Sequence, residues 1–275
     1  MKNMKDNIRW VIQSNLINDG DLQELRDGCT DIGVEYESVI VLPYSKQMPE
    51  FTIDDKINIY YGSTTFMYNL YEQLNAPIGL FYNHETYSMV NYMDKWGEYM
   101  LNCDAHIIKV GDFFKEDRDP EENVFIRPDG DGKEIDGQVK KFKDAVPWLE
   151  RYLKYDNRLT LESNILVGPA YNLFKEWRLY IVNNEIVTAS RYRKDFKLSK
   201  SSEDIPEEML EFARERISEY SPHDSYAMDI ASVHDGEYYI IECGCLNSVG
   251  FYHADIKKIV RKVSEYICTS KETIN

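Results

Sequence analysis

Apolar residues in the first 110 positions fall into short segments of two kinds. Compact runs of β-branched and aromatic residues predict strands, and longer stretches with apolar residues three or four positions apart predict helices. The predicted strands are 10–13, 37–42, 57–61 and 105–110, and the predicted helices are 20–29, 66–74 and 87–101. Strands that alternate with helices are typical of a parallel α/β sheet.

Hairpins are the main prediction for the second half of the chain. Asn183-Asn184 separates two apolar runs, and His234-Asp235-Gly236-Glu237 separates two more between Ser225 and Tyr252. Short polar links of this kind, Asp-Gly above all, indicate antiparallel strand pairs. Helices are predicted at 144–155 and 206–220, with a last one carrying the apolar stripe Ile256, Ile259, Val260, Val263 and Ile267. The acidic run 116–123, which contains Pro120, is expected to connect two lobes.

The overall charge narrows the classes of partner. The 275 residues include 32 Lys and Arg against 48 Asp and Glu, a formal net charge of −16. Such a surface repels nucleic-acid phosphates and anionic lipid, so broad binding to either is not expected. The sequence shows neither an apolar run of membrane-helix length nor a signal-peptide core, and its five scattered cysteines are typical of reduced thiols. We therefore expect a cytoplasmic protein with no membrane partner.

Two carboxylates stand inside the apolar runs of the last hairpin. Asp229 lies in the first run, and Glu242 ends the second run thirteen residues later. Charged residues are rare in buried strands unless something pairs with them, and across a hairpin these two would face the same side. A shared Mg²⁺ would neutralise both, since Mg²⁺ typically takes one or two carboxylates plus substrate phosphates. Two alternatives stay open: solvated acids on an edge hairpin, and buried partners of arginines.

A second candidate site is the polar loop that follows Arg127-Pro128. It reads Asp129-Gly130-Asp131-Gly132-Lys133. Glycines let backbone N–H groups approach a phosphate closely, and Arg127 and Lys133 add positive charge. The same letters also suit an ordinary surface turn. An EF-hand calcium loop does not match, because its twelfth position would be Lys140 in place of glutamate.

Three arginines flank the Asn183-Asn184 hairpin. Arg178 lies at the start of one strand, and Arg191 and Arg193 lie at the end of its partner. A two-stranded ribbon therefore brings them near one another. Arginines gathered in an acidic protein suit a polyanion such as a triphosphate, or a substrate carboxylate. Salt bridges to the surplus of Asp and Glu are the alternative.

Taken in order, these segments resemble the ATP-grasp superfamily, and in detail its branch named for two arginines and a lysine, which is frequent in bacteria and their phages. The matching residues are Arg127-Pro128, Lys133, Gly137-Gln138-Val139, Glu176-Trp177-Arg178, Ser190-Arg191-Tyr192-Arg193, and Glu242 with Gly250-Phe251-Tyr252. No single motif is specific, but the whole series in this order is. The detailed resemblance runs from Val124 to the C-terminus, and before that only the α/β pattern and the Tyr61-Gly62-Ser63 turn match.

The resemblance implies an α/β (α+β) ATP-grasp fold with an N-terminal α/β domain over residues 1–118 and a two-lobed nucleotide-binding domain over residues 119–275. It also implies ATP and Mg²⁺ as cofactors. The implied activity is that of an ADP-forming ligase, which activates a carboxylate as an acyl phosphate for attack by an amine. These substrates would be small molecules or peptides, and nothing in the sequence identifies them or the oligomeric state.

By position, the resemblance assigns roles to individual residues. Arg127 and Lys133 would bind phosphates, and Glu176 would approach the ribose. Adenine would lie against the backbone of Val167, Gly168, Pro169 and Ala170. The transferring phosphoryl group or the acceptor carboxylate would be bound by Arg178, Arg191 and Arg193. The metal ligands would be Asp229, Glu242 and Asn247.

Two positions depart from the ATP-grasp pattern. Gly244 stands where most of these enzymes have a metal-binding Asn. Either Asn247 supplies that oxygen through a bent loop, or the second metal site is weaker. Ala227 stands where an arginine is common, and the hairpin arginines would take over its charge. A catalytically weak or inactive nucleotide-binding regulator or scaffold therefore stays open as a second class. An α+β interaction domain without nucleotide is a third.

Overall fold

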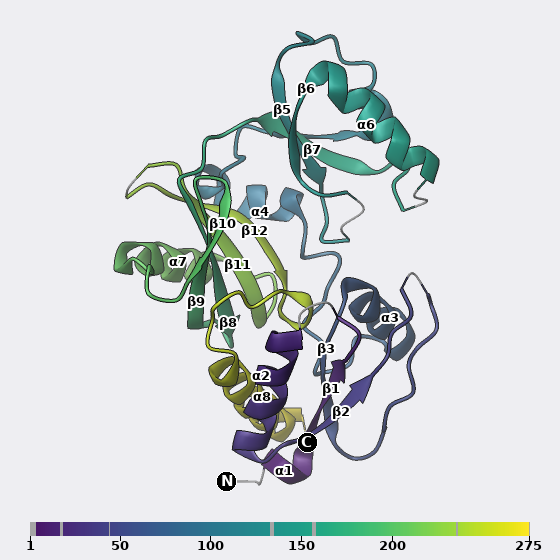
Figure 1. Cartoon of the computed structure of the whole chain (residues 1–275), viewed down its shortest axis with the longest axis vertical. Helices are drawn as coiled ribbons and strands as arrows, with labels where there is room; N and C mark the ends of the chain where they lie inside the picture. The colour runs from purple at the N-terminus through teal and green to yellow at the C-terminus, as the bar shows by residue number, and fades with distance from the viewer. Residues whose placement is uncertain are drawn as a thin grey trace.

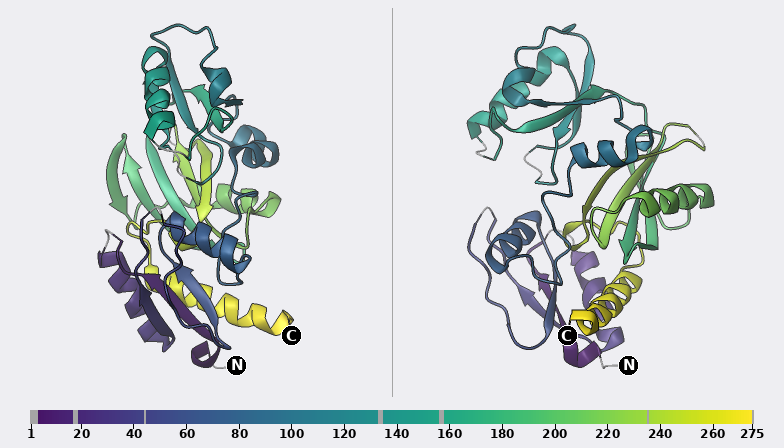
Figure 2. Two further views of the ribbon diagram at one scale, coloured as in Figure 1. Left: turned by 90° about the vertical axis from the view of Figure 1, so that its right-hand side faces the viewer. Right: turned by 180° about the vertical axis from the view of Figure 1, so that it is seen from behind.

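The computed structural model describes residues 4–16, 19–43, 45–132, 135–155, 158–234 and 236–274. Its strands form three separate sheets of three, four and five strands. Figures 1 and 2 show the three-stranded sheet at one end of the molecule, close to both chain ends, and the four-stranded sheet at the other end. The five-stranded sheet lies between them. Helices and sheets are both well represented, which confirms the predicted mixed class.

The three-stranded sheet has the parallel α/β pattern that the sequence predicts. Its strands β1 (Ile8–Gln13), β2 (Glu35–Val39) and β3 (Ile57–Tyr61) are parallel in the order β2-β1-β3. The short helix α1 (Met4–Asn7) precedes β1, α2 (Asp19–Ile32) joins β1 to β2, and α3 (Thr64–Leu74) follows β3. Apolar residues of β1 and α2 pack in one core cluster with α8 (Ile256–Ile274). Ser63 caps α3, because its side chain accepts a hydrogen bond from the backbone N–H of Phe66.

The four-stranded sheet is antiparallel, with the order β4-β7-β5-β6. Its elements are β4 (His106–Lys109), α5 (Val110–Phe113), β5 (Asn123–Pro128), β6 (Gln138–Lys141), α6 (Phe142–Tyr155) and β7 (Asn164–Pro169). We expected β4 to continue the parallel pattern, and that was wrong, because β4 pairs antiparallel with β7. The acidic run 116–123 joins α5 to β5 inside this unit instead of connecting lobes, and Arg118 pairs there with Glu116 and Glu122. The division of the chain after residue 118 stays a prediction.

The five-stranded sheet contains both predicted hairpins. It consists of β8 (Lys175–Val182), β9 (Glu185–Lys194), β10 (Lys197–Ser201), β11 (Ser225–Ser232) and β12 (Tyr238–Cys245), antiparallel in the order β10-β9-β8-β11-β12. Asn183 and Asn184 turn the first hairpin with φ of 52° and 60°, which is the geometry of a two-residue hairpin loop. Asp235, in the turn of the second hairpin, lies outside the described residues.

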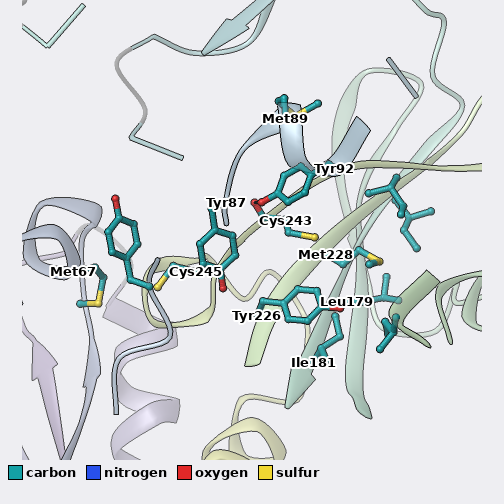
Figure 3. Close-up of a cluster of buried hydrophobic side chains, with 14 of the residues drawn as sticks. Met67, Tyr87, Met89, Tyr92, Leu179, Ile181, Tyr226, Met228, Cys243 and Cys245 are labelled. Atoms are coloured by element: carbon teal, nitrogen blue, oxygen red, sulfur yellow. Dashed lines mark hydrogen bonds between the residues drawn. The ribbon is translucent and has the colours of Figure 1, made fainter. Parts of the chain in front are cut away.

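One face of this sheet forms the largest core cluster. Alternate residues such as Leu179, Ile181 and Met228 are buried there together with residues of α7 (Glu207–Glu219) and α4 (Met89–Trp96), and the 3₁₀ turn η1 (Gly97–Tyr99) follows α4. Figure 3 shows side chains of the same cluster, among them Tyr92 from α4 and Met67 from α3. Because side chains alternate along a strand, Glu176, Arg178 and Asp229 belong to the opposite face. Within the described residues no helix is long and apolar enough to cross a bilayer.

Asn247 joins the five-stranded sheet to the N-terminal sheet. It lies in the 3₁₀ turn η2 (Leu246–Ser248), directly after β12. Its side-chain nitrogen donates to the carbonyl oxygens of Tyr60 at 2.6 Å and Gly79 at 3.0 Å, and its side-chain oxygen accepts from the N–H of Phe81 at 2.7 Å. The carboxamide is buried and engaged at both ends. The structure thus places the Asn247 side chain against the backbone of Tyr60, Gly79 and Phe81. Its expected role as a metal ligand stays a prediction.

Candidate functional site

A cavity of about 620 Å³ lies between the four-stranded and the five-stranded sheet. Its walls come from β5, β6 and the end of β7 on one side, and from β8, β9 and β12 on the other. A volume of this size falls within the range of roughly 300–1,000 Å³ that is usual for small-molecule sites. The predicted site residues that line it are Arg127, Pro169, Ala170, Glu176, Arg193 and Glu242.

The segment after β7 supplies one wall. Pro169 and Ala170 line the cavity together with Tyr171, Asn172 and Leu173. Val167 and Gly168 do not line it: Val167 is fully buried in the core of the four-stranded unit, and Gly168 packs so closely on Ala105 that an added Cβ would meet it at 2.6 Å. Two of the four residues predicted to contact adenine, Pro169 and Ala170, therefore line the cavity, and the lining continues to Leu173.

Arg127 and Glu242 meet across this cavity. Along β5 the residues alternate between buried and partly exposed, which turns Phe125 and Arg127 away from the core and toward the cavity. The Nη2 of Arg127 lies 2.6 Å from Oε2 of Glu242 at the edge strand β12. The Nε of Arg127 donates to the carbonyl oxygen of Pro128 at 3.1 Å. One ion pair thus links the two sheets.

Asp229 and Glu242 lie opposite each other on neighbouring strands, as the sequence predicts for the hairpin. Their Cα positions are partners in the β11–β12 register, and Arg178 is the partner of Asp229 on the other side. Arg178 holds Asp229 through two hydrogen bonds, Nε to Oδ1 at 2.7 Å and Nη2 to Oδ2 at 2.8 Å. Asp229 is buried and does not line the cavity. Of the alternatives left open, burial excludes a solvated acid at Asp229, and both carboxylates have arginine partners here.

Aromatic rings fix the guanidinium of Arg178. Tyr192 and Tyr252 stack with ring centroids 4.8 Å apart and an interplanar angle of 11°. The Arg178 guanidinium carbon lies 5.8 Å from one ring centroid and 5.2 Å from the other, within the range of cation–π attraction. Tyr252 adopts a φ of 57°, unusual for a tyrosine, directly after Gly250-Phe251. This conformation places the ring of the Gly-Phe-Tyr motif beside the arginine.

A β-bulge brings Tyr192 and Arg193 to the same carboxylate. Glu176 pairs with Arg193 and Trp177 with Arg191, so Tyr192 is the extra residue on β9. The Tyr192 hydroxyl donates to Glu176 at 2.8 Å and to Asp229 at 3.3 Å, and Arg193 reaches Glu176 at 3.5 Å. Burial raises the pKa of the Glu176 carboxyl, and the Tyr192 and Arg193 contacts oppose that rise. Tyr192 is a site residue that sequence reasoning missed, because a bulge has no reliable signal in the letters.

Arg191 lies on the other face of the sheet. Its guanidinium pairs with Asp204 and donates to Ser199, and the carbonyl of Asp204 also accepts from the buried Trp177 ring at 2.7 Å. It does not line the cavity. Arg178 and Arg193 share the opposite face of the sheet, although only Arg193 of these three arginines lines the cavity. Arg191 has the salt bridge that was the alternative.

The loop after β5 brings a further carboxylate into the site. Asp131 lines the cavity, and its Oδ2 accepts from the N–H of Cys245 at 3.4 Å. The same oxygen lies 3.6 Å from where a Cβ on Gly244 would stand. Lys133 lies outside the described residues. The sequence analysis singles out this loop but assigns no role to Asp131. Only the fold shows that the Asp131 side chain reaches Gly244.

The chain has the same fold as solved ligase structures. D-cycloserine synthetase superposes with a TM-score of 0.63 at 13% identity, covering 95% of this chain and 100% of that one. A D-alanine–D-alanine ligase from Bacillus anthracis complexed with ATP gives 0.57 at 13% identity, covering 97% and 98%. A Chryseobacterium gregarium RiPP-associated ATP-grasp ligase, in complex with ADP and a leader and core peptide, gives 0.54 at 13% identity, covering 96% and 97%. The fold is that of the ATP-grasp ligases.

Sequence comparison then places the chain within this class. The family described as ATP-grasp domain, R2K clade family 3, matches residues 78–263, and the chain belongs to that family. The resemblance stated from the motifs is thereby confirmed. A search of the curated proteins finds no match.

Proposed function

We propose that the chain is a Mg²⁺-dependent, ADP-forming carboxylate–amine ligase that binds ATP in the cavity between the four-stranded and five-stranded sheets. The observation that supports this most is the Arg127–Glu242 contact. It sets a cation suited to phosphates beside a carboxylate suited to Mg²⁺, on opposite walls of a cavity of nucleotide size. ATP-grasp membership supplies the reaction class.

The lining of the cavity fits a nucleotide. Phe125, Val139 and Ile241 provide apolar surface, and the backbone of 169–173 runs along the same cavity. These are suited to a base, which combines flat apolar faces with a polar edge. Arg127 offers a planar, permanently charged donor for phosphate oxygens. Arg193 and Glu176, on the other wall, would contact the sugar or phosphates.

The carboxylates present fit Mg²⁺. Glu242 lines the cavity, and Asp131 puts an oxygen beside Gly244, where ATP-grasp enzymes commonly have Asn. Among the described residues no three His, Cys, Asp or Glu side chains gather to hold a metal by themselves. That suits Mg²⁺, which is commonly bound by one or two carboxylates and completes its shell with phosphate oxygens and water. When bound, the ion would neutralise phosphate charge, held by Glu242 and Asp131, while Asp229 would keep Arg178 in place.

The proposed chemistry needs positioning more than a protein nucleophile. An oxygen of the acceptor carboxylate attacks the γ-phosphorus, the bond from that phosphorus to the β–γ bridging oxygen breaks, and ADP leaves. The amine nitrogen then attacks the acyl carbon. The bond from that carbon to the phosphate oxygen breaks, inorganic phosphate leaves with the electron pair, and the nitrogen loses a proton to solvent. Arg127 and Arg178 would stabilise the charge spread over the transferring phosphoryl group. On nucleotide binding, Arg127 would leave Glu242 and contact the phosphates. The Glu242 carboxylate would then be available to hold the metal.

Nucleotide binding is the first test. Calorimetry with a non-hydrolysable ATP analogue should show binding that EDTA abolishes. Arg127→Ala should weaken it about ten- to hundredfold, because a charge-assisted hydrogen bond contributes about 1.5–3 kcal/mol. Lys133→Ala tests the loop in the same way. Arg214→Ala is the matched control, since Arg214 forms an exposed ion pair with Glu207 on α7. Titrations that stay flat at millimolar nucleotide would rule out the proposal.

Turnover separates the enzyme from a regulator of the same fold. ADP release measured against a panel of carboxylates and amines should depend on both substrates and on Mg²⁺. Gly244 in place of Asn favours the alternative, a nucleotide-binding regulatory or scaffold protein. Tight analogue binding without ADP release, together with retained binding in Asp131→Asn, would support that alternative.

A further inference from the structure

A second, larger cavity of about 1,320 Å³ adjoins the nucleotide cavity. Its walls come from α3 and the loop at 45–46 on one side, and from the end of α6 and the loop at 130–132 on the other. Figure 1 shows the end of α6 and the α3 region facing each other. Gly130 and Asp131 line both cavities. A molecule in the second cavity can therefore approach the end of the first where Asp131 and Gly244 lie together.

The second cavity gathers positive charge on an acidic protein. Lys46, Lys154 and Arg158 line it, although the whole chain carries a net charge of −16. Lys46 and Lys154 come from opposite walls, and within the described part of the chain neither has an ion pair with a carboxylate. The Nζ of Lys154 lies 5.2 Å from the centroid of the Tyr155 ring. Glu72 and Asp131 are the acids of the lining. The ammonium groups of Lys46 and Lys154 are therefore suited to an anionic ligand.

The start of α3 adds to this preference. Thr64 and Thr65, the first two residues of this 11-residue helix, line the cavity. Backbone N–H groups at a helix start carry partial positive charge and favour anions. The Tyr61-Gly62-Ser63 turn, singled out in the sequence, places this helix start: Gly62 donates to the carbonyl of Asn247 at 2.9 Å, and Ser63 caps the helix.

The size and aromatic content point beyond a single amino acid. The volume exceeds the roughly 1,000 Å³ upper range of ordinary small-molecule pockets. Tyr68 and Tyr155 line it from opposite walls with much of their surface exposed, 46% and 75%. Tyrosines exposed in a concave surface are common contact residues for peptides, because they bring large area at low entropic cost.

We propose that this cavity binds the carboxylate substrate, and that this substrate is a peptide-sized molecule with at least one further anionic group. The inference rests on the proposed function. The reacting carboxylate would lie near Gly130 and Asp131, at the shared wall. The second anionic group would contact Lys46 and Lys154. Tyr68 and Tyr155 would contact the body of the peptide.

The test is binding of defined probes to the full chain, with and without the Mg²⁺-loaded ATP analogue. The probes are N-acetyl tetraglutamate, N-acetyl tetraglutamine amide and glutarate, measured by calorimetry. Tetraglutamate should bind at least tenfold more tightly than the other two, and its affinity should fall with added salt. Lys46→Ala combined with Lys154→Ala should weaken it at least tenfold. The same double variant should leave analogue binding unchanged.

A charge-matched control and the analogue titration make every outcome decisive. Lys95→Ala with Lys257→Ala removes the same charge from exposed sites on α4 and α8, and should leave tetraglutamate binding intact. Equal binding of tetraglutamine overturns the charge preference, and equal binding of glutarate overturns the peptide size. No tetraglutamate binding, or binding unaffected in the cavity variant, overturns the site. If the wild-type chain does not bind the ATP analogue, the proposed function is contradicted. Probe binding measured without nucleotide still tests the proposal for this cavity.

Discussion

Asp229 and Glu242 are register partners on the five-stranded sheet, each with its own arginine, and the two arginine–carboxylate pairs differ in what they join. Arg178 and Asp229 are neighbours in register on β8 and β11, held by two short hydrogen bonds with side chains only 15% and 5% exposed. Arg127 and Glu242 come from different sheets and share one contact of 2.6 Å, with Glu242 31% exposed. The first pair lies inside one rigid element. The second spans a cavity.

This difference indicates different tasks for chemically similar pairs. A buried pair with both partners fixed by strand register cannot part without leaving a charge in the interior, so Asp229 anchors Arg178. A pair at the rim of a cavity can exchange partners, because solvent or a ligand can take over either charge. The proposed function therefore assigns the exchange of partners, from each other to phosphate and metal, to Arg127 and Glu242.

The largest expected effect is on the anchored pair. Asp229→Asn leaves the Arg178 charge buried without its partner, so the free energy of unfolding without ligand should fall by about 3–5 kcal/mol. Urea unfolding measures it. Asp31→Asn, which breaks the exposed contact to Lys257, is the control and should cost less than about 1 kcal/mol. If Asp229→Asn leaves stability unchanged or raises it, repulsion from the Glu242 carboxylate outweighs the attraction of Arg178 for Asp229.

The pair across the cavity should respond mainly when ligand is present. Glu242→Gln should cost less stability without ligand than Asp229→Asn, because Arg127 can turn into the cavity. With Mg²⁺ and an ATP analogue at about 100 times the dissociation constant, the wild-type chain should gain about 2.7 kcal/mol. Glu242→Gln should lose most of that gain. Unfolding curves with and without ligand measure both, and a variant that keeps the full gain would exclude Glu242 from the metal site.

A smaller effect is expected at the hydroxyl that connects the anchored pair to Glu176. Tyr192→Phe removes the donor to both Glu176 and Asp229 but keeps the stack on Tyr252. Stability should fall by about 1–2 kcal/mol, since buried acceptors lose a partner. Tyr252→Phe keeps both the stack and the Tyr192 hydroxyl, and serves as the control. Equal losses in the two variants would contradict a specific role for the Tyr192 contacts.

The smallest effect is a pH dependence at Glu176. Burial raises the pKa of this carboxyl above its ordinary value, so the folded state binds its proton more tightly than the unfolded state does. Glu176 therefore lowers stability as pH rises from about 4.5 through the raised pKa. Glu176→Gln should remove this part of the pH dependence, so the stability difference between variant and wild type should shift in favour of the variant as pH rises. A difference that stays constant between pH 4 and 7 would contradict the shift.

Much of the framework follows from local pattern. Ile57–Tyr61 matches β3 residue for residue, and both predicted hairpins form. Asp229 and Glu242 are register partners because the β11–β12 register shifts by one residue between Asp229 and Ile230. Without that shift, the pairing next to the turn would set Asp229 opposite Ile241. The family itself could be stated from the order of short motifs, since each motif is a local sequence.

Only the tertiary structure decided which polar residues share a site. The bulge at Tyr192 leaves Arg193 at the cavity while Arg191 contacts Asp204 on the other face. Asn247 hydrogen-bonds the backbone of Tyr60 in β3 and of Gly79 and Phe81 after α3, and Asp131 reaches Gly244 from 113 residues away. The sequence by itself determined the strands, the hairpins and the motifs, because these depend on neighbours in the chain. Side-chain direction and long-range hydrogen bonds depend on how whole sheets pack, which no local pattern encodes.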